Sequence, residues 1–161
     1  MPVSAEDLAV ITEQLGREAR GVVDVAARCV CGRPAVVKTL PRLPNGTPFP
    51  TTFYLTHPRA VSSVGTLEAS GLMREMTARL GEDEELAAAY QRAHEDYLAR
   101  REELGQVEEI AGISAGGMPT RVKCLHVLVA HSLAVGPGIN PLGDEALARL
   151  KPLWDPAVCT C

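Results

Sequence analysis

The hydrophobic residues of this chain change their spacing at Pro58. Before it, residues 21–29 alternate apolar and more polar side chains as a half-buried strand does, and residues 34–56 hold two more strand-like runs around an Asn-Gly turn. After it, apolar residues recur at helical spacing. This order predicts an α+β fold, in which a small antiparallel sheet of about three strands, with a hairpin, packs against about five helices.

The boundaries follow from turn and capping residues. Ser4 and the acids after it predict a first helix at 5–15, and Pro119 predicts the first turn of a helix at 119–135, apolar on most sides and therefore buried. Acids at 84–85 and arginines at 100–101 match the dipole of a long helix at 84–104 with a solvated outer face, which includes His94. Residues 105–118 are expected to form a glycine-rich loop, 143–150 a short helix and 152–161 a flexible tail.

Composition narrows the function classes. The 161 residues fit one domain, 1–161, and a net charge of -4 makes nucleic acid an unlikely partner. No secretory signal is visible, and no apolar run approaches the roughly 18 residues that span a bilayer, so we expect a cytoplasmic protein without a membrane partner. In that reducing compartment the five cysteines are expected as thiols or metal ligands rather than disulfides.

Cysteine and histidine residues stand where expected elements begin or end. Cys29 and Cys31 end the first strand, His57 follows the hairpin, and Cys124 lies on the buried helix. On an extended strand the two thiols share one face about 6.6 Å apart, and a bend at Gly32 would let one metal take both. A closed set of Cys29, Cys31, His57 and Cys124 is typical of structural zinc, with a pair of buried thiols as the alternative for Cys29 and Cys31.

The residues around Cys124 are assigned to an outer shell. On one helix Cys124 and His126 lie about 200° apart, and Cys124 and His131 are separated by about 10.5 Å of rise, so neither pair forms a clamp. His126 and His131 are therefore expected to lie behind the metal ligands, with a position in the core as the alternative for His131, while Arg121 and Lys123 could bind an anion or occupy the surface.

Three functions remain open from the residues. The first is a zinc domain that binds or scaffolds a protein partner, and an iron–sulfur cluster suits its ligands less well. The second is a small thiol-dependent enzyme that acts on an anionic substrate through Cys124 with His57 or His131 as base. The third is a metal-free interaction module. The tail thiols, Cys159 and Cys161, repeat the Cys-x-Cys spacing and offer an alternative completion of the site at Cys29 and Cys31.

Several ordered blocks resemble one bacterial family. They are Arg28-Cys29-Val30-Cys31-Gly32, the proline-rich run 41–51, Tyr54-Leu55-Thr56-His57-Pro58, and 121–126 with 130–133. Together they are similar to the domain-of-unknown-function family numbered 501, mainly actinobacterial, over about residues 7–150. The resemblance carries no established activity; gene neighbourhood implies an association with cell division or polyphosphate metabolism. It also implies that cysteine can replace His57, as suits a zinc ligand, and that Cys31 can be replaced by other residues.

Overall fold

A three-stranded antiparallel sheet lies at the centre of the protein. The structure, a computed structural model, describes residues 3–158. Strands β1 (Val22–Arg28), β2 (Pro34–Thr39) and β3 (Phe53–Leu55) follow one another in sheet order, with Val25 opposite Val37 and Val36 opposite Leu55. The middle strand is the most buried because it is paired on both edges. The α+β class and the sheet of three strands are confirmed.

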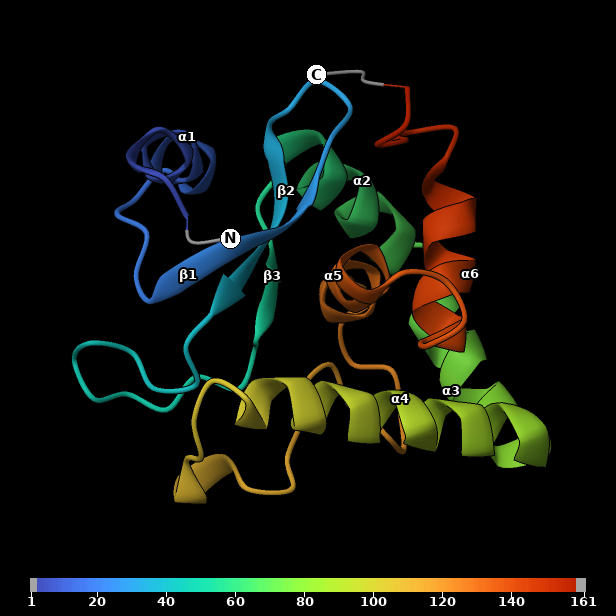
Figure 1. Cartoon of the computed structure of the whole chain (residues 1–161). Coiled ribbons are helices and arrows are strands. Elements are labelled where there is room, and N and C mark those ends of the chain that lie inside the picture. The colour runs from blue at the N-terminus through green and yellow to red at the C-terminus, as the bar shows by residue number, and fades with distance from the viewer. Residues whose placement is uncertain (1–2, 159–161) are drawn as a thin grey trace.

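Helices cover both faces of this sheet. Helix α1 (Ala5–Leu15) lies on one side, and α5 (Leu125–Val135) lies on the other with α2 (Pro58–Glu68) and α6 (Pro141–Leu150) around it (Figure 1). Helices α3 (Leu72–Glu82) and α4 (Glu84–Glu102) continue past the end of the sheet, and a short 3₁₀ helix, η1 (Glu108–Ile110), follows α4. The main core therefore lies between the sheet and α5.

Helix α5 begins later than the sequence predicts. It is the buried central helix, but residues 119–124 of the expected helix 119–135 are not helical. Their N–H groups bond elsewhere, because Lys123 and Cys124 donate to the Gly116 carbonyl oxygen and Val122 donates to Thr77 Oγ1. This later start turns Cys124 from a mid-helix residue into the N-cap of α5.

The long helix α4 also differs from expectation on one face. This otherwise polar helix packs one face into the core. The buried residues on that face recur at helical spacing and include Tyr90, His94, Tyr97 and Arg101. His94, expected on a solvated face, instead holds a 2.7 Å hydrogen bond between Nδ1 and Ser114 Oγ. Burial lowers the pKa of this imidazole. The prediction failed because the buried partner comes from the distant loop at 105–118.

Candidate metal centre

Three side chains with metal-ligand atoms meet where α2 ends and α5 begins. Glu68 is the last residue of α2, Cys124 occupies the N-cap position before α5 and His126 is the second residue of α5. One ligand atom from each lies within 4.8 Å of the other two, and all three residues are partly buried. Within residues 3–158 this is the group of three or more Cys, His, Asp or Glu residues that is compact enough to hold one metal ion.

The backbone of α5 fixes the Glu68 carboxylate. Leu125 N–H donates to Glu68 Oε2 at 2.8 Å, while the Cys124 side chain makes no capping bond of its own. The first N–H groups of a helix lack partners within the helix and carry partial positive charge, so a carboxylate is favoured there. Glu68 therefore acts as the cap that helix α5 would otherwise lack, and the same carboxylate also contacts His126.

Both ring nitrogens of His126 face hydrogen-bond acceptors. Nε2 lies 3.2 Å from the Val61 carbonyl oxygen, and Nδ1 lies 3.1 Å from Glu68 Oε2. A carbonyl oxygen can only accept, so Nε2 carries a proton. In a neutral ring the lone pair of Nδ1 would then point at a carboxylate oxygen, which is repulsive. A positive species, either a proton or a metal ion, must sit between Nδ1 and the Glu68 carboxylate.

The electrostatics agree with this geometry. The hydrogen bond with Cys124, against the effect of burial and with help from Glu68, raises the pKa of His126 to about 9. The metal-free ring is therefore protonated at neutral pH, and a bound cation would take the place of the proton on Nδ1.

The donor set fits a transition metal. Thiolate, imidazole and carboxylate are the ligands that zinc takes in proteins, and three protein ligands leave a fourth position open. The Nε2–H bond from His126 to a backbone carbonyl is the outer-shell contact that orients most metal-bound histidines. These three side chains therefore form a group that could hold one metal ion.

Two clefts border this centre. The apolar cleft, about 610 Å³, is lined by Cys124 and His126 together with aliphatic and aromatic side chains, among them Leu15, Phe53, Leu55, Val61 and Val127. The basic cleft, also about 610 Å³, is lined by Cys124, Arg121 and Lys123 with the loop 113–118. Cys124 lines both clefts, so a molecule in either one can contact this residue.

The structure divides the predicted zinc ligands. It brings Cys124 together with Glu68 and His126, and not with Cys29, Cys31 and His57. His57 precedes α2 and Glu68 ends it, and at 1.5 Å per residue these backbone positions are about 16 Å apart. Cys29 and His57 are buried, and Cys31 is exposed in the turn between β1 and β2. Cys159 and Cys161 lie outside the described residues.

Two predicted outer-shell groups take different positions. His131 is a core residue with no exposed surface; its Nε2 contacts Asp96 Oδ2 at 2.8 Å and its Nδ1 contacts Asn140 Nδ2 at 3.2 Å. Burial, despite Asp96, lowers its pKa. His126, expected outside the site, is one of its members, because Cys124 lies before the helix and the helical-wheel argument does not apply.

Sequence reasoning missed Glu68. An available signal was its position, because a carboxylate in the last turn of a helix is unfavourable next to the negative end of the helix dipole. No basic residue in that turn offsets it. A charge that is unfavourable within its own helix suggests that it interacts with another element, and here Glu68 interacts with the start of α5.

The chain matches one known protein family over most of its length. Residues 25–148 match the family model described as Protein of unknown function (DUF501). The chain belongs to the DUF501 family. The matched DUF501 span contains Glu68, Cys124 and His126. Neither the curated proteins nor the solved structures gave a match. No helix within residues 3–158 has the length and apolar character to cross a membrane.

Proposed function

We propose that this DUF501 protein is a metal-dependent ligand-binding protein, with one zinc ion held by Glu68, Cys124 and His126 and a fourth position open to the clefts. The observation that carries the proposal is the pair of acceptors around His126, which requires a positive species beside Nδ1. A divalent ion between imidazole, carboxylate and thiolate meets that requirement and uses all three side chains at once.

Zinc is favoured over other metals by the ligands. One sulfur, one nitrogen and one oxygen donor form a mixed set that suits zinc, whereas magnesium and calcium prefer oxygen alone. An iron–sulfur cluster needs several thiolates, and this centre contains one. When bound with an open position, zinc polarises a coordinated carbonyl or water, so the centre would support hydrolytic chemistry as well as binding.

The clefts indicate the class of ligand. Arg121 and Lys123 favour an anionic group in the basic cleft, and the aliphatic lining of the apolar cleft favours a hydrocarbon portion. Because Cys124 lies between the two, we propose a small ligand that is anionic at one end and apolar at the other. The cellular role in cell division or polyphosphate metabolism, and the cytoplasmic location, stay predictions.

Zinc titration of the metal-free protein tests the proposal. Cys124→Ser and Glu68→Gln should weaken binding at this centre by at least tenfold to a hundredfold, because even outer-shell changes have effects of that size. The matched control is Glu85→Gln, which removes a carboxylate from an exposed position on α4 and should leave affinity unchanged. Equal zinc affinity in wild type, Cys124→Ser and Glu68→Gln would refute the centre.

A thiol nucleophile at Cys124 is the second candidate. It is favoured by a protonated His126 next to a cysteine that lines two clefts, since such pairs occur in thiol enzymes. Alkylation of the metal-free protein at neutral pH, mapped by mass spectrometry, separates the candidates. Rapid modification of Cys124 in a protein that does not bind zinc would favour the enzyme. Slow modification and no zinc binding would leave the metal-free interaction module.

A further inference from the structure

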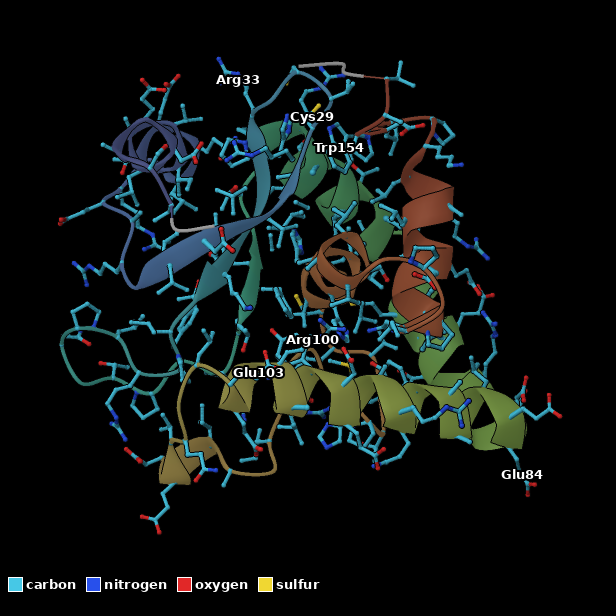
Figure 2. The ribbon with its side chains drawn as sticks, in the orientation of Figure 1. Cys29, Arg33, Glu84, Arg100, Glu103 and Trp154 are labelled. Atoms are coloured by element: carbon cyan, nitrogen blue, oxygen red, sulfur yellow. The ribbon has the colours of Figure 1, made fainter. Side chains whose placement is uncertain are left out.

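A buried serine and a buried histidine form a pair at the edge of the basic cleft. Ser114 Oγ lies 2.7 Å from His94 Nδ1, and the exposed fractions are 2% for the serine and 8% for the histidine. His94 lies about halfway along α4, whose two ends are marked by Glu84 and Glu103 in Figure 2. Ser114 belongs to the glycine-rich loop that follows this helix. The pair therefore joins a helix to a loop that returns past it.

The hydroxyl proton of Ser114 has one good acceptor. The Met118 carbonyl oxygen is 3.5 Å from Ser114 Oγ, at the limit for a hydrogen bond, whereas His94 Nδ1 is 2.7 Å away. Burial lowers the pKa of His94, with Glu95 opposing and Arg101 adding to this effect, so the ring is neutral at pH 7. A neutral ring with its proton on Nε2 accepts at Nδ1. Donation from the serine to the histidine is the arrangement of a nucleophile and its base.

Ser114 also lines the basic cleft, which contains Arg121 and Lys123. Because so little of Ser114 is exposed, this cleft is the side from which a substrate reaches it. His94 is not among the residues that line the cleft, so a substrate meets the serine before the base. A nucleophile backed by its base and a wall that attracts anions therefore belong to one cleft.

The glycine-rich loop offers two N–H groups to the same cleft. The Ala115 carbonyl oxygen accepts from Met118 N–H at 3.2 Å, and the Gly116 carbonyl oxygen accepts from Lys123 N–H at 2.7 Å. In a trans peptide the C=O and the following N–H point in opposite directions, so the N–H groups of Gly116 and Gly117 point away from these donors. Neither N–H has an acceptor in the described part of the chain. Both glycines line the cleft, where paired N–H groups can form an oxyanion hole.

Packing against the next segment fixes the position of this loop. Gly117 has a φ of 93°, and a Cβ there would lie 2.8 Å from both the Arg121 carbonyl oxygen and the Lys123 nitrogen. Only glycine allows so close an approach. Arg121 N–H also donates to the Gly117 carbonyl oxygen at 3.0 Å. The two N–H groups are therefore held in place before a substrate binds, as effective oxyanion donors must be.

We propose that Ser114 and His94 are the nucleophile and the base of an esterase whose substrates carry an anionic group. Ser114 Oγ bonds to the ester carbonyl carbon while its proton moves to His94 Nδ1, and the N–H groups of Gly116 and Gly117 bind the negative oxygen. The bond to the alcohol oxygen then breaks, and that oxygen takes the proton from Nδ1. Water attacks the acyl-serine in the same way, which releases the acid and restores the hydroxyl. The inference rests on the proposed function only for the anionic group in the basic cleft, and the metal centre takes no part.

Labelling with an alkyl fluorophosphonate, mapped by mass spectrometry, tests the nucleophile and its base. We expect an adduct on Ser114 in wild type. His94→Asn should be labelled at least about a hundredfold more slowly, because an amide can bond to the hydroxyl but cannot act as a general base. Ser70→Ala is the control, since it removes an exposed hydroxyl that bonds only to a backbone carbonyl, and it should leave the rate unchanged. No adduct on Ser114 in wild type, or equal rates in wild type and His94→Asn, would overturn the proposal.

The pH dependence of labelling in wild type is a second test that needs no variant. Because the pKa of His94 is lowered, the rate should be half-maximal below pH 6.5 and constant above it. A rate that keeps rising above about pH 8 is that of a hydroxyl without a base, and it would overturn the role of His94.

A chelator separates this site from the metal centre. Labelling of Ser114 should be the same with and without it, and loss of labelling on chelation would overturn a metal-independent site. If zinc titration fails while Ser114 is labelled, the metal centre is refuted and the esterase stands. If zinc binds and Ser114 is not labelled, the esterase is refuted and the metal centre stands.

Two esters of equal chain length test the anionic group. They are mono(4-nitrophenyl) adipate, which carries a carboxylate at its far end, and 4-nitrophenyl hexanoate, which is neutral. For the part of the hydrolysis that is lost in Ser114→Ala, we expect kcat/KM to be about tenfold higher for the adipate ester. Lys123→Gln should reduce this preference. Equal kcat/KM for the two esters in wild type would refute the anionic class of substrate.

Discussion

Replacing Glu68 by glutamine should lower the pKa of His126 in the metal-free protein. In wild type the hydrogen bond with Cys124 and the Glu68 carboxylate hold that pKa at about 9. The amide is nearly the same shape and can still accept from Leu125 N–H, so the substitution removes charge and leaves the cap. An opposite charge at this distance shifts a pKa by about one to three units, so we expect a fall of at least about one.

The raised pKa of His126 also contributes to the stability of the folded protein. A pKa of about 9 instead of 6.5 corresponds to roughly 3 kcal/mol in favour of the protonated ring. The side chain of His126 is 29% exposed, so solvent screening reduces this to about 1–2 kcal/mol. Because the folded pKa is raised, this stability is complete below pH 6.5 and is lost as the pH rises through about 9. In Glu68→Gln the loss of stability between pH 6.5 and about 9 should therefore be smaller.

Histidine NMR titration with a chelator present measures the pKa directly. Only one of the four imidazoles should titrate above 6.5, because burial lowers the pKa of each of the others, His57, His94 and His131. Glu85→Gln, at an exposed position, is the control and should leave the high pKa in place. The reasoning is refuted if every histidine of wild type titrates at or below 6.5, or if Glu68→Gln leaves the high value unchanged.

Three further predictions concern the scaffold. Gly143→Ala should lower the free energy of unfolding by at least about 1–3 kcal/mol in urea melts, because its Cβ would overlap the Leu128 carbonyl and Ser132 hydroxyl oxygens of α5. Gly81→Ala, in open space on α3, should instead stabilise by about 0.5–1 kcal/mol, and equal effects would contradict the packing argument. The lowered pKa of His131 means that stability should fall as the pH drops below 6.5, by at most about 1.4 kcal/mol per pH unit, and His131→Gln should reduce that slope. Tyr97→Phe leaves the buried Phe53 N–H without its acceptor and should lower the free energy of unfolding by about 1–3 kcal/mol, and an unchanged urea midpoint would show that this bond contributes nothing.

Local pattern predicted most of the secondary structure because periodicity and capping act over a few residues. The sheet with its hairpin and the first helix at 5–15 follow from alternation and the Ser4 cap, and the long helix, expected at 84–104 and observed at 84–102, follows from the charges at its ends. The start of α5 could not be predicted from local pattern, because the N–H groups before it bond to acceptors outside the helix. These acceptors are Gly116, in the preceding loop, and Thr77, which is distant in sequence. A helical pattern indicates where the sequence favours a helix. Hydrogen-bond acceptors outside the helix, which compete for its first N–H groups, decide where the helix begins.

The candidate centre shows the same limit more sharply. The sequence marked Cys124 as chemically important, but it assigned His126 to the wrong side of a helix and gave no role to Glu68. That error follows from the boundary, since two residues on either side of a helix start do not obey the helical wheel. Once α5 begins at Leu125, Cys124 and His126 can turn toward one acid.

By itself the sequence determined the α+β class, the family-specific blocks and the residue types from which a metal site could be made, because these depend on local composition and order. Only the tertiary structure decided which of those residues meet. Glu68 reaches Cys124 and His126 because α2 ends against the start of α5, and His57 reaches Trp154 because the C-terminal segment returns to the sheet. Ligand atoms must converge within a few ångströms, and that precision comes from helix packing between segments far apart in the chain.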